Sequence, residues 1–577
     1  MNIKMAKRIQ LNEKEKQKGN PNSGNSKLSV TFLGGLNKIG RNCMVLEYNE
    51  RLLVIDCGIM FPEVDMLGID FILPDLNYLY ERKDQIDGIV ITHAHEDHAG
   101  GLQFLLREVQ APIYSSQLSL ALLSKRLDEG GVLSKTSLVE VHDGETHKIG
   151  EFDVEFLPVT HSVPHAFAAS YSCDGGTIFH TGDFKIDHSP IDGRRTDLAR
   201  IGEIASSKEI LLLLSDSTGA ERPGTTRSES TVRTSIERIF RENQNKRIIV
   251  STFASHIHRM IQIIEAALEQ DRKLAFLGRS MKTNIAIARE LGILTFDDRC
   301  LIDIEEVEHY GAEEVCVICT GSQGEPLSAL SLISSGQSKF LSVNEDDVVV
   351  LSSHTIPGNE TGVNRIINGL MRRGAKVIHD DNAPIHVSGH ASADELLTML
   401  AITKPKYFVP VHGEHRHMKA HAELALDAGM PKENVFICHD GDAIVFDGDS
   451  AQIENDRASS AYLYVDGNVG GITNALLRDR REIGSDGLIV IVVTVDYQDG
   501  SIVGDVEVVT RGWIPRADVD DYKSVTQERV RSAVENALQA GEREIEALKA
   551  IVRKAAGAST TDTTGRRPIV LPLVIEV

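Results

Sequence analysis

The sequence predicts an α/β protein in which a sheet-rich domain is interrupted by an inserted α/β unit and followed by a small α+β domain. Three observations support this fold class. From residue 28 onward, short apolar runs bounded by Gly, Asn and Asp follow one another closely, which is typical of strands. Between about 226 and 384, helical patterns alternate with strands, which indicates a doubly wound unit. Near residue 385 the first pattern returns.

The same patterns divide the chain into segments. The first strands are KLSVTFLGG, RLLVIDCG and DGIVITH, and the last part contains the strand LIVIVVTVDY, an amphipathic helix from about Val525 to Ala555, and the terminal strand PIVLPLVIEV. The C-terminal part carries no recognisable chemistry, so docking or oligomerisation is its expected role. The expected segments are an arm at 1–27, the sheet-rich domain at 28–225 and 385–450, the insertion at 226–384, a polar linker at 451–460 and a C-terminal domain at 461–577.

Composition is that of an ordinary globular protein, with 41% hydrophobic and 25% charged residues. No run approaches the roughly 18 apolar residues of a membrane-spanning helix, so we expect a cytoplasmic protein without a membrane partner. The net charge of −23 argues against a broad phosphate-binding surface. Bound metal ions would nevertheless supply positive charge where a phosphate reacts. The arm is basic, with seven Lys or Arg and two Glu in the first 30 residues, and is either an RNA-contacting or a merely solvated tail.

The seven cysteines are scattered, which fits reduced thiols better than a disulfide framework. Cys316 and Cys319 form a CxxC in the strand-like run EVCVICT, with no second pair nearby. A zinc site needs more ligands than this pair offers. We therefore expect both residues to be buried in the core.

The strongest chemical signal is the cluster HAHEDH at residues 93–98. It follows a predicted strand directly, and its imidazoles and carboxylates are ligands that Zn²⁺ and Mn²⁺ accept. Such a cluster would be costly to fold without a compensating cation. Other predicted strands also end in a polar residue, so these side chains should gather at one rim of the sheets: Asp56, His161, Asp183 and Asp216. The pattern predicts a metal-dependent hydrolase.

THAHEDHAGG resembles the HxHxDH signature of the metallo-β-lactamase superfamily, an αββα sandwich with two metal ions at one edge. The resemblance implies that Asp183 bridges the ions and that Asp56, in VIDCG, orients neighbouring groups. A purely structural role is the alternative for Asp56, and also for a strand-end histidine such as His161. The implied ligands are His93, His95 and His161 for one ion, and Asp97, His98 and a later histidine for the other.

The inserted unit resembles the β-CASP domain of superfamily members that cut nucleic acids. Its three motifs match Asp216 in LLSDST, His390 in HVSGHAS and His412 in PVHGE, and His412 supplies the later metal ligand. A histidine at the third motif is typical of RNA-acting members. The resemblance therefore implies an RNA substrate.

Nearly all of residues 28–577 resembles the ribonuclease J family, through motifs that include LGGLNKIGRNCM, DSTGAERPG, TFASHIHR, TGSQGEP and HVSGH. This resemblance implies a 5′-to-3′ exonuclease with additional endonuclease activity in rRNA processing and mRNA decay. It also implies homodimers or homotetramers, with other RNA-decay proteins as further partners. The implied cofactors are two divalent ions, Zn²⁺ or Mn²⁺, with Mg²⁺ a third candidate. The metal in use and the balance of the two activities stay open.

The resemblance also implies roles in catalysis. Asp97 orients the nucleophile, and His390 stabilises the transition state or protonates the leaving oxygen with Asp216 as its partner. A structural role that fixes the SGH turn is the alternative for His390. The resemblance assigns a pocket for a 5′-monophosphate to Ser255, His386 and Ser388. Hydroxyl and imidazole groups can donate hydrogen bonds to a phosphate. Turn or helix-cap roles are the alternatives for the two serines.

Three other functions compete with this interpretation. A DNA-processing β-CASP nuclease is opposed mainly by His412 and by the series of motifs that resembles ribonuclease J. A small-molecule hydrolase of thioesters or lactams is permitted by HAHEDH alone, but the insertion should cover the metals and form a channel suited to a long strand. A noncatalytic RNA-binding subunit is opposed by the presence of every expected ligand.

Overall fold

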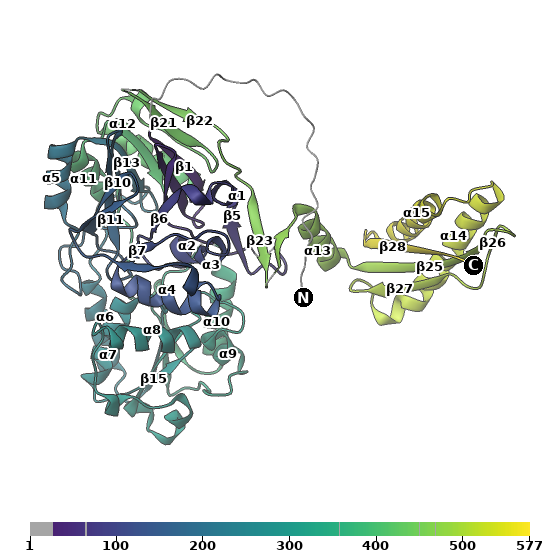
Figure 1. Cartoon of the computed structure of the whole chain (residues 1–577). Helices are drawn as coiled ribbons and strands as arrows, with labels where there is room; N and C mark the ends of the chain where they lie inside the picture. The colour runs from purple at the N-terminus through teal and green to yellow at the C-terminus, as the bar shows by residue number, and fades with distance from the viewer. Residues whose placement is uncertain (1–26, 64–65, 357, 449, 468) are drawn as a thin grey trace.

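The computed structural model describes residues 27–63, 66–356, 358–448, 450–467 and 469–577. All but the last residue of the predicted basic arm lies outside these ranges, so its role stays a prediction. The described chain forms a sandwich domain, an α/β domain and a separate C-terminal domain (Figure 1).

Two sheets face each other in the sandwich domain. The first has eight strands in the order β22 (Ser450–Glu454), β21 (Ala443–Asp447), β1 (Ser29–Gly34), β3 (Cys43–Tyr48), β4 (Arg51–Ile55), β6 (Ile86–Val90), β7 (Ile113–Ser115) and β8 (Leu138–Glu140). The second has six, in the order β19 (Tyr407–Val411), β13 (Ile210–Asp216), β12 (Gly176–His180), β11 (Phe167–Cys173), β10 (Phe152–Pro158) and β9 (Thr146–Ile149).

Apolar side chains from both sheets fill the space between them, among them Phe32 and Ile55 from the first sheet and Phe156 and Leu214 from the second. The outer face of each sheet packs against helices through a core of its own. Helices α2 (Glu96–Ala99), α3 (Leu102–Leu105) and α4 (Gln117–Glu129) cover the first sheet, and α5 (Leu198–Lys208), α11 (Ala393–Thr403) and α12 (His415–Asp427) cover the second. The predicted αββα sandwich is confirmed.

The inserted α/β domain enters between β13 and β19, which are neighbouring parallel strands of the second sheet. Its own sheet is entirely parallel, as the alternating pattern predicts. The strand order is β15 (Lys273–Leu277), β16 (Val315–Cys319), β14 (Arg247–Ser251), β17 (Asp347–Leu351) and β18 (Lys376–Ile378). One face packs on α6 (Ser230–Glu242), α7 (Ile257–Leu268) and α8 (Arg279–Glu290), the other on α9 (Ala329–Ser335) and α10 (Glu360–Arg372).

Cys316 and Cys319 both lie in β16 and are fully buried, as predicted. Cys316 belongs to the core on one face of the sheet and Cys319 to the core on the other. Side chains of a strand alternate between faces, so residues three apart point in opposite directions. This pair therefore cannot bind one metal ion.

The predicted linker at 451–460 differs from the structure. Residues 450–454 form β22, which pairs with β21 at the edge of the first sheet. Beyond them, β23 (Tyr462–Asp466) pairs with β5 (Phe71–Pro74) and with β24 (Val469–Ile472), so the chain remains attached to the sandwich up to residue 472. Exposure alternates along β22, as is typical of an edge strand. The polar residues at its exposed positions make the segment look like a linker in the sequence.

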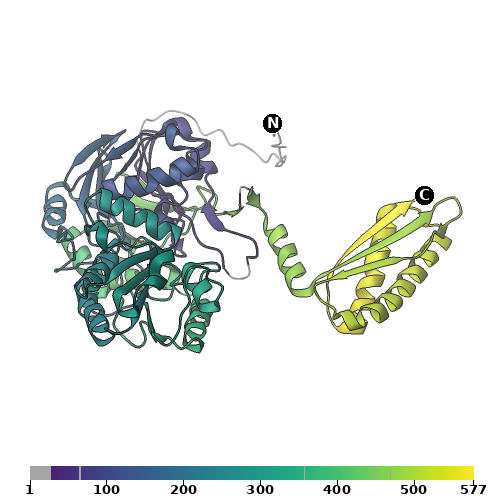
Figure 2. The ribbon, with the colours of Figure 1, turned by 90° about the horizontal axis from the view of Figure 1, so that it is seen from below.

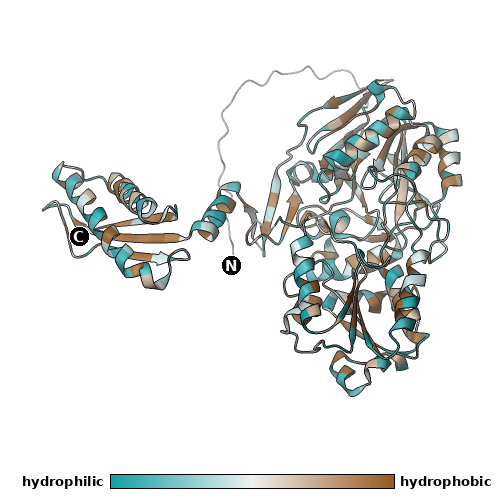
Figure 3. Cartoon of the chain, turned by 180° about the vertical axis from the view of Figure 1, so that it is seen from behind, coloured by the Kyte–Doolittle hydropathy of each residue, from teal (hydrophilic) through white to brown (hydrophobic). Residues whose placement is uncertain are grey.

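The C-terminal domain stands apart from the rest, with α13 (Asn474–Asp486) between them (Figure 2). Its central strand β25 (Leu488–Asp496) pairs with β26 (Ser501–Ile502), β27 (Glu507–Arg511) and β28 (Ile569–Glu576). Alternate residues of β25 are buried against two helices, α14 (Val519–Gln539) and α15 (Ile545–Thr564). Figure 3 shows this strand as a hydrophobic stripe.

The single helix expected from Val525 to Ala555 is wrong, because two helices occupy this region. Gly541 has a φ of +91°, a left-handed conformation that ends α14 and reverses the chain. The two helices then pack against each other, and Tyr522 Oη lies 2.7 Å from Thr560 Oγ1. None of the helices in the described ranges is long and apolar enough to cross a membrane.

Candidate metal centre

The polar residues predicted at strand ends meet at one edge of the sandwich. His93 follows β6, His161 follows β10, Asp183 follows β12 and His412 follows β19, while Asp216 is the last residue of β13. Strands that run in the same direction within a sheet deliver their carboxyl ends to the same edge. His412 has a φ of +52°, so the chain turns sharply where β19 ends.

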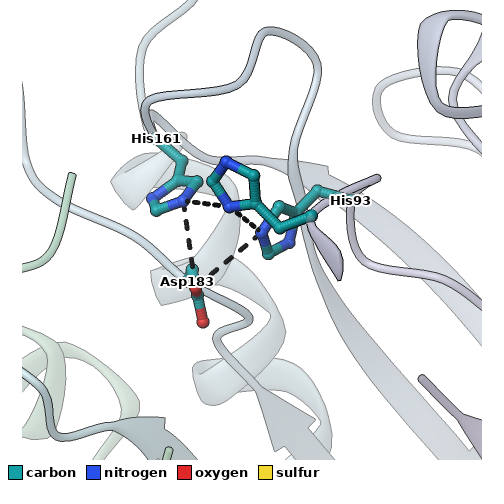
Figure 4. A group of neighbouring side chains, drawn as sticks. His93, His161 and Asp183 are labelled. Atoms are coloured by element: carbon teal, nitrogen blue, oxygen red, sulfur yellow. Dashed lines mark hydrogen bonds and ion pairs between the residues drawn. The ribbon is translucent and has the colours of Figure 1, made fainter. Parts of the chain in front are cut away.

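The first ligand group consists of His93, His95, His161 and Asp183. The Nδ1 atom of His95 lies 2.9 Å from His93 Nε2 and 3.3 Å from His161 Nε2. Oδ2 of Asp183 lies 3.8 Å from the Nε2 atoms of both His93 and His161. Figure 4 shows the imidazoles of His93 and His161 turned toward the carboxylate of Asp183, with dashed lines marking these two contacts. One potential ligand atom from each of the four residues lies within 4.8 Å of the others.

The second group consists of Asp97, His98, Asp183 and His412, and its ligand atoms also lie within 4.8 Å of one another. His98 Nε2 is 3.3 Å from Asp183 Oδ2 and 3.6 Å from Asp97 Oδ2. His412 Nε2 is 3.2 Å from Asp97 Oδ2, and its Nδ1 is 3.4 Å from Asp183 Oδ1. Asp183 thus belongs to both groups and lies between them.

Hydrogen bonds fix which nitrogen of two histidines faces the centre. His98 Nδ1 lies 2.8 Å from Asp56 Oδ2, and His161 Nδ1 lies 2.9 Å from the carbonyl oxygen of Gly389. Each acceptor holds a proton on Nδ1 and turns Nε2 toward the centre as the candidate ligand atom. Asp56 also accepts bonds from the backbone N–H and hydroxyl of Thr92, so its carboxylate is held rigidly. The orienting role of Asp56 stays a prediction, which its contact with His98 supports.

The protonation of the first group suits a divalent ion. Burial lowers the pKa of His95 to about 4 and that of His161 to about 3, and burial likewise holds the pKa of His93 well below its usual value. All three imidazoles are therefore neutral near pH 7, with lone pairs that Zn²⁺ or Mn²⁺ accepts.

In the second group, the charges of histidine and carboxylate side chains offset each other. Burial opposes protonation of His412, but Asp183, Asp216 and Asp97 outweigh it and raise its pKa to about 10. Burial also raises the pKa of Asp183, yet His412, His98 and His390 bring it well below its usual value. A cation that binds here would replace these protons as partner of the carboxylates. The residues of both groups thus fit a pair of divalent ions.

Asp216 and His390 form a third feature beside the two groups. His390 Nδ1 lies 2.7 Å from Asp216 Oδ2, the shortest contact between a histidine and a carboxylate in this site. Burial lowers the pKa of His390, but Asp216 and Asp183 outweigh this effect and raise it. The backbone N–H of Thr218 donates to Asp216 Oδ1, and the hydroxyl of Thr218 contacts His412 Nδ1 at 2.9 Å. The structure thus brings together His390 and Asp216, which the sequence predicts to be partners.

The predicted phosphate pocket is only partly assembled. Ser388 lines a small cavity beside His161 that is also lined by Lys185 and His256, whereas Ser255 and His386 are not among its lining residues. The hydroxyl of Ser388 accepts the backbone N–H of His390 at 3.1 Å, so its own proton stays free to donate. Burial lowers the pKa of His386 to about 3, and its buried Nδ1 has no partner among the described residues. His386 is thus a neutral imidazole with an unused nitrogen.

Several residues of the site were not predicted. Thr92, Thr218 and Gly389 act through hydrogen bonds to site residues, and each lies inside a motif already noted, namely THAHEDH, DST and HVSGH. Gly389 has a steric reason to be glycine, because a Cβ there would lie 2.8 Å from the His161 ring. The signal that could have revealed these residues is their position one or two residues from a predicted site residue.

We expect Asp56→Ala to lower the affinity for Mn²⁺ about 10- to 100-fold, because His98 loses the acceptor that orients it. Calorimetric titration of the metal-stripped variant with Mn²⁺ measures this change. Asp87→Ala, which removes a carboxylate near the start of β6 that pairs with Arg51, is the control and should bind Mn²⁺ like the wild type. Unchanged affinity in Asp56→Ala would leave Asp56 a purely structural residue.

Family models match four stretches of the chain. Residues 36–226 match the metallo-beta-lactamase superfamily, and residues 245–370 match the ribonuclease J beta-CASP domain. Residues 377–438 match the Zn-dependent metallo-hydrolase RNA specificity domain, and residues 475–577 match the ribonuclease J C-terminal domain.

Comparison with whole proteins gives the same family as the family models. Ribonuclease J 1 of Streptococcus pyogenes is 39% identical over 551 residues, which cover 95% of this chain and 98% of the relative. Ribonuclease J2 of Bacillus subtilis is 38% identical over 549 residues, with the same coverage, and ribonuclease J of Helicobacter pylori is 40% identical over 82% of this chain and 69% of its own. A solved structure from Enterococcus faecalis V583, described as a protein of unknown function, aligns with 73% of this chain and 100% of its own at a TM-score of 0.52 and 16% identity, which supports the fold alone.

Proposed function

The chain belongs to the ribonuclease J family, and we propose that it hydrolyses RNA phosphodiesters with two divalent metal ions held at the HAHEDH edge. The observation that carries this proposal is the position of Asp183, whose carboxylate belongs to two complete ligand groups at once. His93, His95 and His161 would hold one ion with Asp183, and Asp97, His98 and His412 would hold the other. When bound, such ions acidify water and neutralise the charge that develops on the phosphoryl oxygens.

The residues around the ligands supply the other catalytic functions. Asp216 raises the pKa of His390, which favours its protonated form, so Nε2 can donate to the leaving oxygen. Asp216 orients this imidazole through the 2.7 Å contact to Nδ1. Asp97 is the more exposed carboxylate of the site, at 28% for its side chain against 3% for Asp183, and is therefore well placed to orient the nucleophile.

RNA is the proposed substrate, and single-stranded RNA the proposed partner. The RNA specificity model covers the segment that contains His390, and relatives named ribonuclease J span nearly the whole chain. Homodimers or homotetramers formed partly through the C-terminal domain, contacts with other RNA-decay proteins and a cytoplasmic location remain proposals from the family. Zn²⁺ and Mn²⁺ are the proposed ions, with Mg²⁺ as a third candidate.

The substrate is tested by incubating the protein with RNA and DNA strands of matched sequence, and with ester and lactam substrates, in defined Mn²⁺, Mg²⁺ or Zn²⁺. We expect RNA to be degraded much faster than DNA and the small substrates to be untouched. Equal cleavage of DNA would favour a DNA-processing nuclease, and turnover of the lactam or ester would favour a small-molecule hydrolase. No hydrolysis of any substrate would leave a noncatalytic RNA-binding protein.

We expect RNA with a 5′-monophosphate to be degraded at least about tenfold faster than RNA with a 5′-triphosphate, because a pocket for one phosphate excludes three. Ser388→Ala should narrow this difference, since it removes a hydroxyl that can donate to the phosphate. Release of mononucleotides from both RNAs is followed over time, and circular RNA reports endonuclease cleavage separately. Equal rates for the two 5′ ends would contradict the pocket.

A further inference from the structure

Two buried charged side chains that belong to neither ligand group hold the chain on both sides of His390. Glu395, in the first turn of α11, is 2% exposed, and Arg259, in α7, is fully buried. Each makes one hydrogen bond to a backbone group at one end of the segment 385–392, which contains Gly389 and His390, and further bonds to neighbouring stretches of chain. We infer that Glu395 and Arg259 are positioning residues that clamp this segment at both ends and set the geometry of His390 for catalysis.

Glu395 ties together three separate stretches of chain. Its Oε1 accepts the backbone N–H of Ile186 at 2.7 Å, and Oε2 accepts those of Thr226 and Ser392 at 2.7 and 2.8 Å. Ile186 lies three residues after Asp183, and Ser392 lies two residues after His390. The bond to Ser392 is an ordinary helix capping box, but the other two bonds are not needed to cap a helix.

Thr226 extends this contact to His390 itself. Its hydroxyl donates to the carbonyl oxygen of His390 at 2.7 Å, while its backbone N–H is bound by Glu395. The backbone of His390 is therefore fixed by a residue that Glu395 fixes in turn. Bonds of this kind to an ionised carboxylate are stronger than those between neutral groups.

Arg259 holds the other end. Its Nη1 donates to the carbonyl oxygen of Ile385 at 2.7 Å and to the carbonyl oxygen of Ser352 at 3.0 Å. The Nε and Nη2 atoms donate to the two carboxylate oxygens of Glu229 at 2.6 and 3.0 Å, so the guanidinium cannot rotate away. From this anchored end the segment runs to Gly389, whose carbonyl oxygen orients His161, and then to His390.

Conservative substitutions weaken each anchor without removing its bulk. In Glu395→Gln the amide nitrogen must face at least one backbone N–H, so Ile186, or Thr226 and Ser392, loses its acceptor. In Arg259→Lys a single ammonium cannot reach both Glu229 and Ile385 with the geometry of the guanidinium. Small misplacement of a catalytic group costs rate even when substrate binding is kept.

The experiment compares these variants with matched controls. Asp442→Asn alters another buried carboxylate that accepts two backbone N–H groups, those of His439 and Asp456. Arg272→Lys alters another buried arginine that donates to backbone carbonyls, including those of Lys246 and Asn243. Neither control contacts segment 385–392. For each variant kcat, KM on 5′-monophosphorylated RNA and Tm are measured.

We expect Glu395→Gln and Arg259→Lys each to lower kcat about 10- to 100-fold while KM changes less than about threefold. The controls should keep kcat within about twofold of the wild type, even where Tm falls equally. Should Glu395→Gln or Arg259→Lys fail to fold, Thr226→Val removes the hydroxyl bond to the carbonyl oxygen of His390 and tests whether backbone bonds around His390 set kcat. The inference would be overturned by an unchanged kcat in Glu395→Gln and Arg259→Lys, by an equal loss of kcat in the controls, or by a change confined to KM.

This inference rests on the proposed function, and the wild type separates the two. A wild-type protein that does not hydrolyse RNA contradicts the proposed function itself. A wild-type protein that hydrolyses RNA, with clamp variants that keep its kcat, contradicts only the positioning roles of Glu395 and Arg259.

Discussion

Asp183→Ala is expected to abolish RNA hydrolysis, with a fall in kcat of about 10³-fold or more, because it removes the carboxylate shared by both ligand groups. Its two oxygens lie within 3.8 Å of nitrogen atoms on His93, His98, His161 and His412. The loss should appear in the metal content as well as in the rate. Hydrolysis of 5′-monophosphorylated RNA and elemental analysis of the purified protein measure the two effects.

The matched control is Glu155→Ala, which removes a buried carboxylate of β10 in the same domain that pairs with Arg200 instead of a histidine. This variant should keep its metal ions and its kcat even if its Tm falls. An Asp183→Ala protein that retains both ions and wild-type activity would show that this carboxylate does not join two metal sites.

His390→Ala should lower kcat about 10²- to 10⁴-fold, the range expected for loss of a general acid. The ions should remain bound and KM should change little, because in our account His390 acts on the leaving oxygen. Asp216→Asn should have an effect of the same kind, since it disturbs the orientation of His390 and removes the charge that raises the pKa of this imidazole. Single-turnover hydrolysis and metal analysis of both variants test this assignment.

His147→Ala provides the control, because His147 lies on β9 and contacts Glu145 instead of a site carboxylate. The ligand atoms of Asp183, Asp216, His390 and His412 also lie within 4.8 Å of one another, so a metal-binding role is the specific rival. If His390→Ala loses a metal ion in proportion to its activity, His390 is a ligand and the proton-donor role is wrong.

The sequence predicted the parts of this protein that depend on local pattern. Strand ends are visible as apolar runs that stop at a polar residue, which is why Asp56, His161, Asp183 and Asp216 were found beside HAHEDH. The αββα sandwich and the parallel inserted sheet follow from the same runs. Conversely, the positive φ of Gly541 and the pairing of the edge strand β22 depend on the packing of neighbouring elements, so the sequence predicts neither the break between α14 and α15 nor this strand.

The contacts that orient the site were beyond sequence reasoning for a different reason. Glu395 and Ile186 are 209 residues apart, and the His161 and Gly389 contact spans 228 residues. Backbone N–H and C=O groups have no sequence signature, so nothing in the chain marks them as partners of a particular side chain. Such contacts become visible only when the insertion folds and segment 385–392 returns to the sandwich.

The central claim, that two metal ions at the HAHEDH edge hydrolyse RNA, is tested most directly by metal titration. The protein is stripped with a chelator and titrated with Mn²⁺, and bound ions per chain and hydrolysis of 5′-monophosphorylated RNA are measured on the same samples. We predict no hydrolysis without Mn²⁺ and full activity when two ions are bound per chain. Hydrolysis by the stripped protein, or none with both ions bound, would contradict the account.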